Sequence, residues 1–556
     1  MNFSQPTSTP QNSLLPQSAD GATQTPPSVE TKAPVNTQAS ITPGPKTPQD
    51  FLATSEARDD VEFPLSQAVR YQQPYREQYH FSPATGWLGD PDGMVRFNNL
   101  YHLFWWGHAE SKDLVHWNER LSPMIGDNGS FVYYSGSVVV DRNNTSGLAA
   151  DPSQPPMIAI YTMHDKATNK ETQGLSVSYD TKSFVFYDQN PVLTSDRPAF
   201  RDPQVFYFAP AQHWIMVIAL PDDRKVSFYA SQDLKHWEHL SDFGPEGAVS
   251  QVWEVPDLFQ LSVDGEPNHK KWVLLCGMGP NREQYFIGDF DGKKFTLDPA
   301  MNGYLKGTLP VSSNGPERAN WLDFGADYYA VRTYRDYDNA ENRVVSMGWL
   351  GNWEYANNVP TSWGKGALAL PRELGLQTYS GGLRIVQRPI PALEGLRQVK
   401  IQVGPWGVNG VTPLSEFKPK RNTYEIDATF QITDPKAKFG IRTAVYGNYG
   451  LSVGYDASTS SLFLDRTNPE HGDFAGLFAK YMTAPLDARD GKVRMHIFVD
   501  QSSVEVFANG GEVTMSALMF PSPESLGINL FSQNGRVSLT SLSAWELDSI
   551  WGVPAK

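Results

Sequence analysis

Three acidic side chains lie in short motifs that share a proline, an aromatic residue and a following apolar segment. They are Asp90 in WLGDPDG (87–93), Asp202 in FRDPQVF (200–206) and Glu254 in WEVPDLF (253–259). Proline holds its local backbone rigid and keeps the residue before it out of the helical region, which suits a short acid that must be aimed into a cleft. Two such carboxyl groups on either side of a glycosidic bond can break it, one as nucleophile or base and the other as acid.

An ordinary structural role also accounts for any single one of these motifs. Asp-Pro pairs commonly begin turns. The chain has 61 acidic residues, so a pair of carboxylates by itself identifies nothing. The recurrence of one setting at three positions is what favours a shared site.

Short apolar segments separated by turns dominate the chain from about residue 70 onward. None is long enough for a typical helix, and β-branched or aromatic residues are frequent in them, so we expect buried strands. The clearest are YHLFWW (101–106), MIAIYTM (157–163), WIMVIAL (214–220), WVLLCGM (272–278) and YYAVRTY (328–334).

A weak internal repeat accompanies these strands. SKDLVHW (111–117) and SQDLKHW (231–237) are close copies, and two looser copies also place an aspartate in a turn before an aromatic residue. The equivalent aspartates are Asp113, Asp180, Asp233 and Asp291, spaced by 67, 53 and 58 residues. Such spacings are typical of propeller blades. Four marked units and the unmarked stretch from about 320 to 395 predict a five-bladed β-propeller.

The pattern changes after the segment QRPIPALEGL (387–396). Apolar and polar residues then alternate, as in TYEIDATFQI (423–432), which is typical of antiparallel sheets packed as a sandwich. We therefore predict an all-β chain with three parts. They are an N-terminal arm (1–55), a propeller domain (56–396) and a β-sandwich domain (397–556).

The N-terminal arm has the composition of a disordered segment. Its first 50 residues contain 6 Ser, 8 Thr and 9 Pro, and such a composition cannot bury enough surface to offset the loss of chain entropy. Ser/Thr/Pro-rich arms are typical of O-glycosylated stalks outside cells. Sequons for N-glycosylation at Asn128, Asn143 and Asn144 agree with that location. We interpret the chain as a mature secreted form, extracellular or associated with a cell wall, whose signal peptide has been removed.

Composition argues against several classes of function. A formal charge of −15 disfavours a nucleic-acid partner, and no apolar stretch is long enough for a transmembrane helix. The single cysteine, Cys276, lies in an apolar run, so we expect an inert buried thiol. The 11 histidines show no HExxH spacing, so we predict no metal and no cofactor. A neutral saccharide fits the charge as a partner, and a homodimer is an open alternative.

The motifs together resemble the invertase-type glycoside hydrolases of family 32. That family carries Asn-Asp-Pro-Asn-Gly after a His-Phe-x-Pro stretch, then Arg-Asp-Pro, then Glu-Cys-Pro-Asp-Leu. This chain has HFSP (80–83), GDPDG (89–93), RDP (201–203) and EVPDL (254–258), in the same order. Supporting matches such as WGHAESKDLVHW (106–117) and SVEVFANGG (503–511) extend the resemblance over about residues 70 to 550.

The resemblance implies a β-fructofuranosidase that acts with retention through a covalent fructosyl-enzyme. By it, Asp90 is the nucleophile, Glu254 the general acid and base, and Asp202 the group that stabilises the transition state. It implies hydrolysis of terminal β-D-fructofuranosides such as sucrose and short fructans, with transfer to other sugars at high concentration. Candidate substrate-binding residues by the same resemblance are Arg201, Trp87, Tyr134, Ser135, Trp105, Tyr329 and Trp349.

The chain departs from the family around Asp90. Both asparagines of the first motif are replaced, by Gly89 and Asp92, and the segment that usually follows the first strand is missing between Phe104 and Gly107. Trp105 is the candidate to replace a lost contact. The altered first motif supports an alternative, a catalytically weak carbohydrate-binding relative of the same fold. Arabinan-type hydrolysis on a similar propeller is a third hypothesis, weakened by the predicted sandwich.

Overall fold

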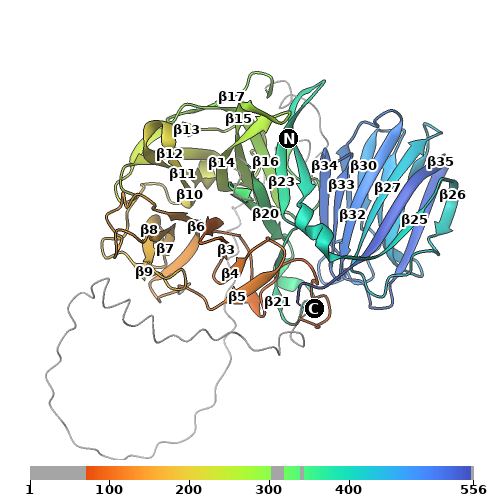
Figure 1. The fold of residues 1–556 in the computed structure, drawn as a ribbon, viewed down its shortest axis with the longest axis horizontal. Coiled ribbons are helices and arrows are strands. Elements are labelled where there is room, and N and C mark those ends of the chain that lie inside the picture. Colours follow the sequence, from red (N-terminus) through yellow and green to blue (C-terminus); the bar gives the residue numbers. More distant parts are fainter. Residues whose placement is uncertain (1–70, 125, 302–318, 338–342, 552–556) are drawn as a thin grey trace, which may run out of the picture. The chain divides into compact units, whose positions relative to one another are not determined.

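The computed structural model describes residues 71–124, 126–301, 319–337 and 343–551. The predicted disordered arm (1–55) lies outside the described residues. The fold is a β-propeller followed by a β-sandwich, as predicted (Figure 1). The complete helical segments among the described residues are short 3-10 turns, namely Ala209–Ala211, Pro221–Asp223, Ala356–Asn358 and Pro391–Leu396.

Three blades of the propeller are separate four-stranded antiparallel sheets. The first consists of β2 (Val95–Phe97), β3 (Leu100–Phe104), β4 (His108–Ser111) and β5 (Trp117–Arg120). The second consists of β6 (Phe131–Val140), β7 (Met157–Asp165), β8 (Glu171–Ser178) and β9 (Val185–Phe186). The third consists of β10 (Arg201–Phe208), β11 (His213–Leu220), β12 (Lys225–Ser231) and β13 (Glu238–Phe243).

The fourth and fifth blades share one hydrogen-bonded network. The fourth contains β14 (Trp253–Val263), β15 (Glu266–Met278), β16 (Arg282–Phe290) and β17 (Phe295–Leu297), with β18 (Asn320–Trp321) on β16. The fifth contains β19 (Tyr329–Tyr334), β20 (Val345–Leu350), β22 (Ala367–Leu368), β23 (Arg372–Tyr379) and β24 (Gly382–Pro389). One parallel residue pair, Val263 with Leu376, joins the two blades. The chain before the first blade contacts the fifth, because β1 (Gly86–Trp87) pairs with β21 (Gly364–Lys365), which lies between β20 and β22 in the sequence.

The repeated aspartates mark the same turn in four blades, which confirms the interpretation of the repeat. Each lies between the third and fourth strand of its blade. Asp113 Oδ1 accepts the backbone N–H groups of Val115 and His116 at 2.9 and 2.8 Å. Asp180, Asp233 and Asp291 do the same two and three residues on. The aspartate therefore satisfies two N–H groups that the turn leaves without strand partners.

The C-terminal strands form two facing layers joined by the long, bent β35 (Gly527–Leu547). Its first half pairs with β28 and its second half with β27, and the apolar faces of both layers meet in one core that includes Ile426, Ile441 and Val506. The other strands are β25 (Arg397–Val403), β26 (Trp406–Pro413), β27 (Tyr424–Ile432), β28 (Lys438–Tyr446), β29 (Tyr449–Asp456), β30 (Ser461–Asp465), β31 (Tyr481–Pro485), β32 (Lys492–Asp500), β33 (Ser503–Ala508) and β34 (Val513–Leu518).

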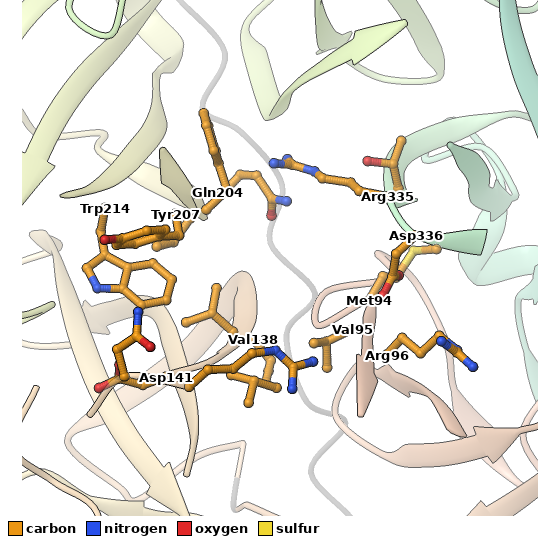
Figure 2. A pocket seen from close by; sticks show the side chains of 17 residues that line it. Met94, Val95, Arg96, Val138, Asp141, Gln204, Tyr207, Trp214, Arg335 and Asp336 are labelled. Atoms are coloured by element: carbon orange, nitrogen blue, oxygen red, sulfur yellow. The ribbon is translucent and has the colours of Figure 1, made fainter. Parts of the chain in front are cut away.

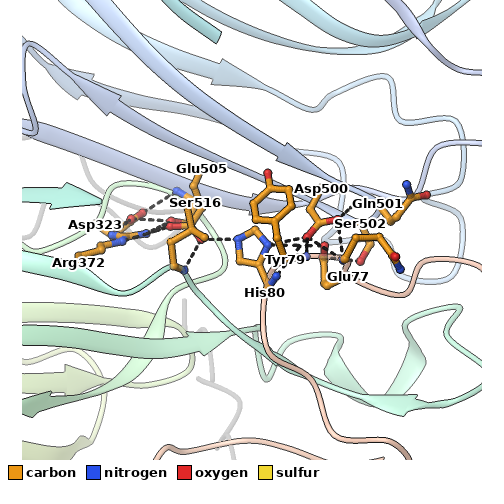
Figure 3. A network of polar contacts seen from close by, with 12 residues as sticks. Glu77, Tyr79, His80, Asp323, Arg372, Asp500, Gln501, Ser502, Glu505 and Ser516 are labelled. Carbon is orange, nitrogen blue, oxygen red and sulfur yellow. Dashed lines mark hydrogen bonds and ion pairs between the residues drawn. The ribbon is translucent and has the colours of Figure 1, made fainter. Parts of the chain in front are cut away.

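A buried polar network joins the segment before the propeller to the sandwich (Figure 3). His80 lies between two carboxylates, with Nδ1 at 2.9 Å from Asp500 and Nε2 at 2.9 Å from Glu505. Arg372 donates to Glu505 at 2.5 Å and to Asp323 at 2.9 Å. Because both ring nitrogens of His80 face carboxylates, the imidazolium form satisfies both contacts.

The charge of His80 makes this contact dependent on pH. Burial by itself lowers the pKa of His80, but hydrogen bonds to Asp500 and Glu505 raise it to about 10. Since the folded pKa lies above the unfolded value of about 6.5, the stability from this group is complete below about pH 6.5 and lost as the pH rises toward 10. This stability is lost because His80 gives up its proton and its charge while it remains between two buried acids.

We expect His80→Gln to lower the free energy of unfolding by about 3 to 5 kcal/mol near pH 6, because it leaves the buried Asp500 without its cationic partner and Glu505 with Arg372 alone. The difference between wild type and variant should shrink by about pH 9. Urea unfolding at both pH values measures this. His116→Gln is the matched control, because that histidine also pairs with an aspartate but is 55% exposed. Equal destabilisation by the two variants would contradict the prediction.

Candidate active site

Bulges in the innermost strands position most of the predicted site residues. The pairing register shifts between Tyr134 and Gly136 in β6, Arg201 and Gln204 in β10, Glu254 and Asp257 in β14, and Tyr329 and Arg332 in β19. A bulge adds a residue to one strand and re-aims its side chains. The acids at 202 and 254 therefore lie inside strands at irregularities, rather than in bends between strands as the proline motifs had indicated.

The backbone at these bulges is strained. Asp202, Val255 and Ala330 have φ values of 62°, 48° and 55°, a left-handed conformation that non-glycine residues rarely adopt. Such strain persists only where the surroundings enforce it, and it is concentrated at functional sites. Three of the five innermost strands thus contain a strained residue at corresponding positions.

Asp90 precedes the first blade in the sequence, and its side chain contacts the second blade. Its Oδ2 accepts a hydrogen bond from the Ser135 hydroxyl at 2.7 Å. Within the described residues its buried Oδ1 has no hydrogen-bond partner. One oxygen is thus held in place by Ser135, while the other is buried without a hydrogen-bond partner.

Glu254 is held from two sides. Arg201 donates to Oε1 from Nη2 at 2.7 Å and from Nε at 3.2 Å, and the Tyr329 hydroxyl donates to Oε2 at 2.6 Å. The side chain of Glu254 is 22% exposed. It can therefore exchange a proton with a bound molecule while keeping its orientation.

Asp202 connects the other two acids. Its Oδ2 accepts the N–H of Val255 at 3.0 Å, next to Glu254. Its own N–H donates to the Thr162 hydroxyl at 3.0 Å, and that hydroxyl donates to the carbonyl of Ser135 at 3.2 Å. The three predicted catalytic acids thus belong to one connected site at the ends of blades one to four.

Crowding of buried carboxyl groups shifts their protonation. Burial raises the pKa of Asp90 to about 6, with a further increase from Glu254 and opposing effects of Ser135, Arg332 and Arg201. Burial raises the pKa of Asp202 to about 7, against the effect of Arg201. A site that concentrates negative charge in this way stabilises a cationic transition state.

Asp92, one of the two departures from the family motif, lies in the same cluster. The Gly136 N–H donates to its Oδ1 at 3.2 Å. Burial, and then the charge of Asp90, raise the pKa of Asp92 well above its usual value. A protonated carboxyl group has one donor and one acceptor, as the amide of asparagine does in the family motif. Gly89, the other departure, lies against the ring of Trp87.

Three tryptophans pack together at β1, the strand that precedes Asp90. Trp87 stacks on Trp353 with ring centroids 5.6 Å apart, and Trp349 contacts both. Trp353 is 42% exposed and Trp349 only 1%. The predicted Trp349 is buried against the other two rings, whereas Trp353 is more exposed and was not among the candidate residues.

Trp105 and Tyr134 border a small cleft beside Asp92. Trp105 packs on Phe81 at 5.4 Å, and Tyr134 stacks on His164 at 5.0 Å. Trp106, where the family segment is missing, also lines this cleft and is 49% exposed.

Sequence reasoning missed Glu171 and Arg332. Glu171 contacts Arg201 at 3.3 Å, and no local pattern marked it. Arg332 is 1% exposed in β19. A signal for it existed, because an arginine interrupts the otherwise apolar strand YYAVRTY.

A larger cavity lies elsewhere, further along the same innermost strands. It has a volume of about 360 Å³ and is lined by Val95, Val138, Gln204, Tyr207 and Arg335, among others (Figure 2). None of the three predicted catalytic acids lines it. A search for the larger cavity alone would therefore not have identified the site that contains the three acids.

Two groups of three histidine or acidic side chains in the described residues could be considered for metal binding. One is the His80 network, in which both ring nitrogens already face carboxylates. In the other, His102 Nδ1 lies 3.1 Å from His108 Nε2 and the ring centroids are 5.4 Å apart, so the rings meet end to end. A metal between them would be half of 3.1 Å from each nitrogen, well short of the roughly 2.0 to 2.1 Å of a Zn–N bond. This contact is a hydrogen bond.

A propeller with paired, buried acids and exposed aromatic rings at one connected site has the features of a glycoside hydrolase. The sequence model of the glycosyl hydrolases family 32 N-terminal domain matches residues 80–389, and that of the glycosyl hydrolases family 32 C-terminal domain matches residues 392–546. The chain belongs to glycoside hydrolase family 32 and is an enzyme of that family.

Similar proteins agree with this assignment. A levanase of Bacillus subtilis is 37% identical over 87% of this chain and 72% of its own length. An extracellular exo-inulinase of Aspergillus awamori is 34% identical over 88% of this chain and 97% of its own.

Two solved structures show the same architecture. The crystal structure of exo-inulinase from Aspergillus awamori has a TM-score of 0.77 at 33% identity, covering 86% of this chain and 100% of that one. A fructofuranosidase from Schwanniomyces occidentalis complexed with fructose has a TM-score of 0.74 at 26% identity, covering 86% and 99%. Fructosyl hydrolysis is the activity that these relatives support.

Among the described residues, no helix is long and apolar enough to span a membrane.

Proposed function

We propose that the protein removes terminal β-D-fructofuranosyl units from sucrose and from fructans, with retention of configuration. The observation that carries this proposal is the linkage of three acids. Ser135 holds Asp90 and is linked through Thr162 to Asp202, whose carboxylate accepts the N–H next to Glu254.

In this mechanism a carboxylate oxygen of Asp90 attacks the anomeric carbon, and Glu254 protonates the leaving oxygen. Water, activated by Glu254 as base, then releases fructose from the covalent intermediate. Asp202 stabilises the positive charge of both transition states. Ser135 and Arg201 orient the first two acids. A retaining mechanism requires carboxyl groups about 5 to 5.5 Å apart.

The proposed substrates include longer fructans for two reasons, namely the names of the similar proteins and the exposed aromatic rings. The similar proteins are named levanase and exo-inulinase. Trp353 and Trp106 are 42% and 49% exposed, and aromatic faces commonly bind sugar rings. Tyr134, Trp87 and Trp105 complete the proposed binding surface.

Transfer of fructose to a second sugar is proposed for high sugar concentrations. The fructosyl-enzyme can be captured by any hydroxyl that displaces water. A similar β-fructofuranosidase from Schwanniomyces occidentalis is described as complexed with fructosyl-erythritol. The same exposed tryptophans would receive the acceptor.

Location, glycosylation and domain boundaries are further parts of the proposal. An extracellular location is supported by the name of the similar exo-inulinase. Asn128 and Asn143 are exposed in the structure, as N-glycosylation requires. Asn144 is a weaker candidate, because its sequon serine, Ser146, is buried against Asp141. A boundary near residue 396 is supported by the 3-10 turn Pro391–Leu396 between β24 and β25.

Products released from sucrose, inulin and levan test the proposal. We expect free fructose from all three, with the β anomer as the first product by NMR. At high sucrose concentration, trisaccharides should accumulate. The Asp90→Asn variant, purified in parallel, provides the background. Fructose release no greater than that background, from every substrate, would contradict the proposal and favour a binding protein.

A further inference from the structure

Arg332 lies beneath the site and contacts the backbone of two motifs. Its guanidinium donates to the carbonyl of Asp202 at 3.2 Å and to the carbonyl of Pro256. These carbonyls belong to the strained bulges of β10 and β14, at the stabilising acid and two residues after the acid/base. One side chain of the fifth blade thus ties the third blade to the fourth.

The charge of this side chain is not neutralised locally. Arg332 is 1% exposed, its Nε has no hydrogen-bond partner, and among the described residues no ion pair joins it to a carboxylate. Burying a cation in this way is costly unless nearby negative charge offsets it. The charges within reach are those of the crowded acids at the site.

We propose that Arg332 is a positioning residue of the fructosyl-transfer site: it fixes the bulges at Asp202 and Glu254 and supplies a buried positive charge beside Asp90. This inference rests on the proposed function. We assign Arg332 no contact with the sugar, because its side chain is buried beneath the backbone that it contacts.

The electrostatics of the surrounding elements agree with this geometry. Arg332 lowers the pKa of Asp90, Asp92 and Glu283, each of which burial raises. The other charged groups facing Asp90 are Glu254 from β14 and Arg201 from β10. The charge of Asp90 also raises the pKa of Asp202 and the pKa of Tyr329. Without Arg332, Arg201 would be the remaining cation acting on Asp90, and it is shared with Glu254 and Glu171.

The test is Arg332→Gln in the full chain, with kcat and KM for sucrose and levan followed over pH. Loss of the cation should move the acidic limb of kcat/KM upward by about half a pH unit or more, because Asp90 becomes harder to ionise. We expect kcat to fall by roughly thirtyfold or more, because the bulges lose their anchor. KM should change by less than about threefold, because Arg332 binds no sugar.

Two further variants separate this role from a structural one. Arg332→Lys keeps the charge but cannot make both backbone contacts in the same geometry. We expect it to keep the acidic limb in place and lower kcat by roughly tenfold. Arg466→Gln is the matched control, because Arg466 is equally buried but pairs with Asp327 away from the site. It should lower the melting temperature without moving the limb.

Each outcome decides the matter. An unmoved limb in Arg332→Gln, or unchanged kcat in Arg332→Lys, would overturn the inference while wild-type turnover keeps the proposed function. If Arg332→Gln does not fold, the kcat of Arg332→Lys decides. A wild-type protein that releases no fructose from either substrate would overturn the proposed function and this inference with it.

Discussion

Asp90→Asn is expected to lower kcat on sucrose and fructans by about 10⁴-fold or more, because it removes the proposed nucleophile. Asparagine preserves the shape and can keep a hydrogen bond with Ser135, which contacts Asp90 at 2.7 Å. It cannot form the fructosyl ester. Initial rates of fructose release, with a coupled assay sensitive to slow turnover, measure the loss.

The same variant should not be less stable than wild type at neutral pH. Burial raises the pKa of Asp90 to about 6, so the folded state binds this proton more tightly than the unfolded state does. The contribution of Asp90 is favourable at low pH and is lost as the pH rises through about 6. Asparagine has no charge to bury, so the melting temperature near pH 7 should stay level or rise. A fall would indicate that lost activity reflects misfolding.

Asp92→Asn is the matched control two residues away. Burial and the charge of Asp90 raise the pKa of Asp92 and so favour its protonated carboxyl group, which an amide imitates. We expect activity within about threefold of wild type, because a neutral hydrogen-bonding group is retained. Equal losses at both positions would remove the distinction between nucleophile and neighbour and count against Asp90 as the attacking group.

Glu254→Ala is expected to lower kcat on sucrose by about 10² to 10⁴-fold, the range typical of a lost general acid and base. The loss should be much smaller for cleavage of a β-fructofuranoside with an activated aryl leaving group, because that leaving group departs without protonation. Comparing the two substrates isolates the role of Glu254 as acid. Similar losses on both would contradict that role.

A small anionic nucleophile provides the second measurement on this variant. Azide needs no general base, so it should accelerate turnover of the trapped fructosyl-enzyme and yield a fructosyl azide with retained β configuration. Asp90→Asn should give no such product, because it forms no intermediate. Glu254→Gln is the companion variant, since it can keep contacts with Arg201 and Tyr329. Rescue of both positions by azide, or of neither, would contradict the assignment of roles.

The alternation patterns and the repeated aspartates explain why the architecture could be predicted. Asp113 and its three equivalents act through neighbouring backbone N–H groups only two and three residues on, so a local sequence signature suffices. Strand segments such as 157–163 and 214–220 bury side chains on both faces, which their unbroken apolar character reflects. Local interactions of this kind can be predicted from the sequence without knowledge of the fold.

The partners of the acids could not be predicted in this way. Ser135 reaches Asp90 across 45 residues, Tyr329 reaches Glu254 across 75, and Arg332 reaches Asp202 across 130. Family resemblance marked Ser135 and Tyr329 as candidates but not their contacts. Arg332 and Trp353 gained their significance only when closure of the propeller brought the fifth blade against the first four.

The sequence by itself indicated which residues are candidates for the chemistry and which segments become strands, because both depend on residue type and short spacing. The tertiary structure alone decided how the acids interact, since bulges, strained φ angles and burial set where each carboxyl group points and how readily it ionises. Asp92 shows the difference most clearly. In sequence it is one more negative charge beside the proposed nucleophile, whereas burial next to Asp90 raises its pKa and favours the neutral form, which resembles an amide.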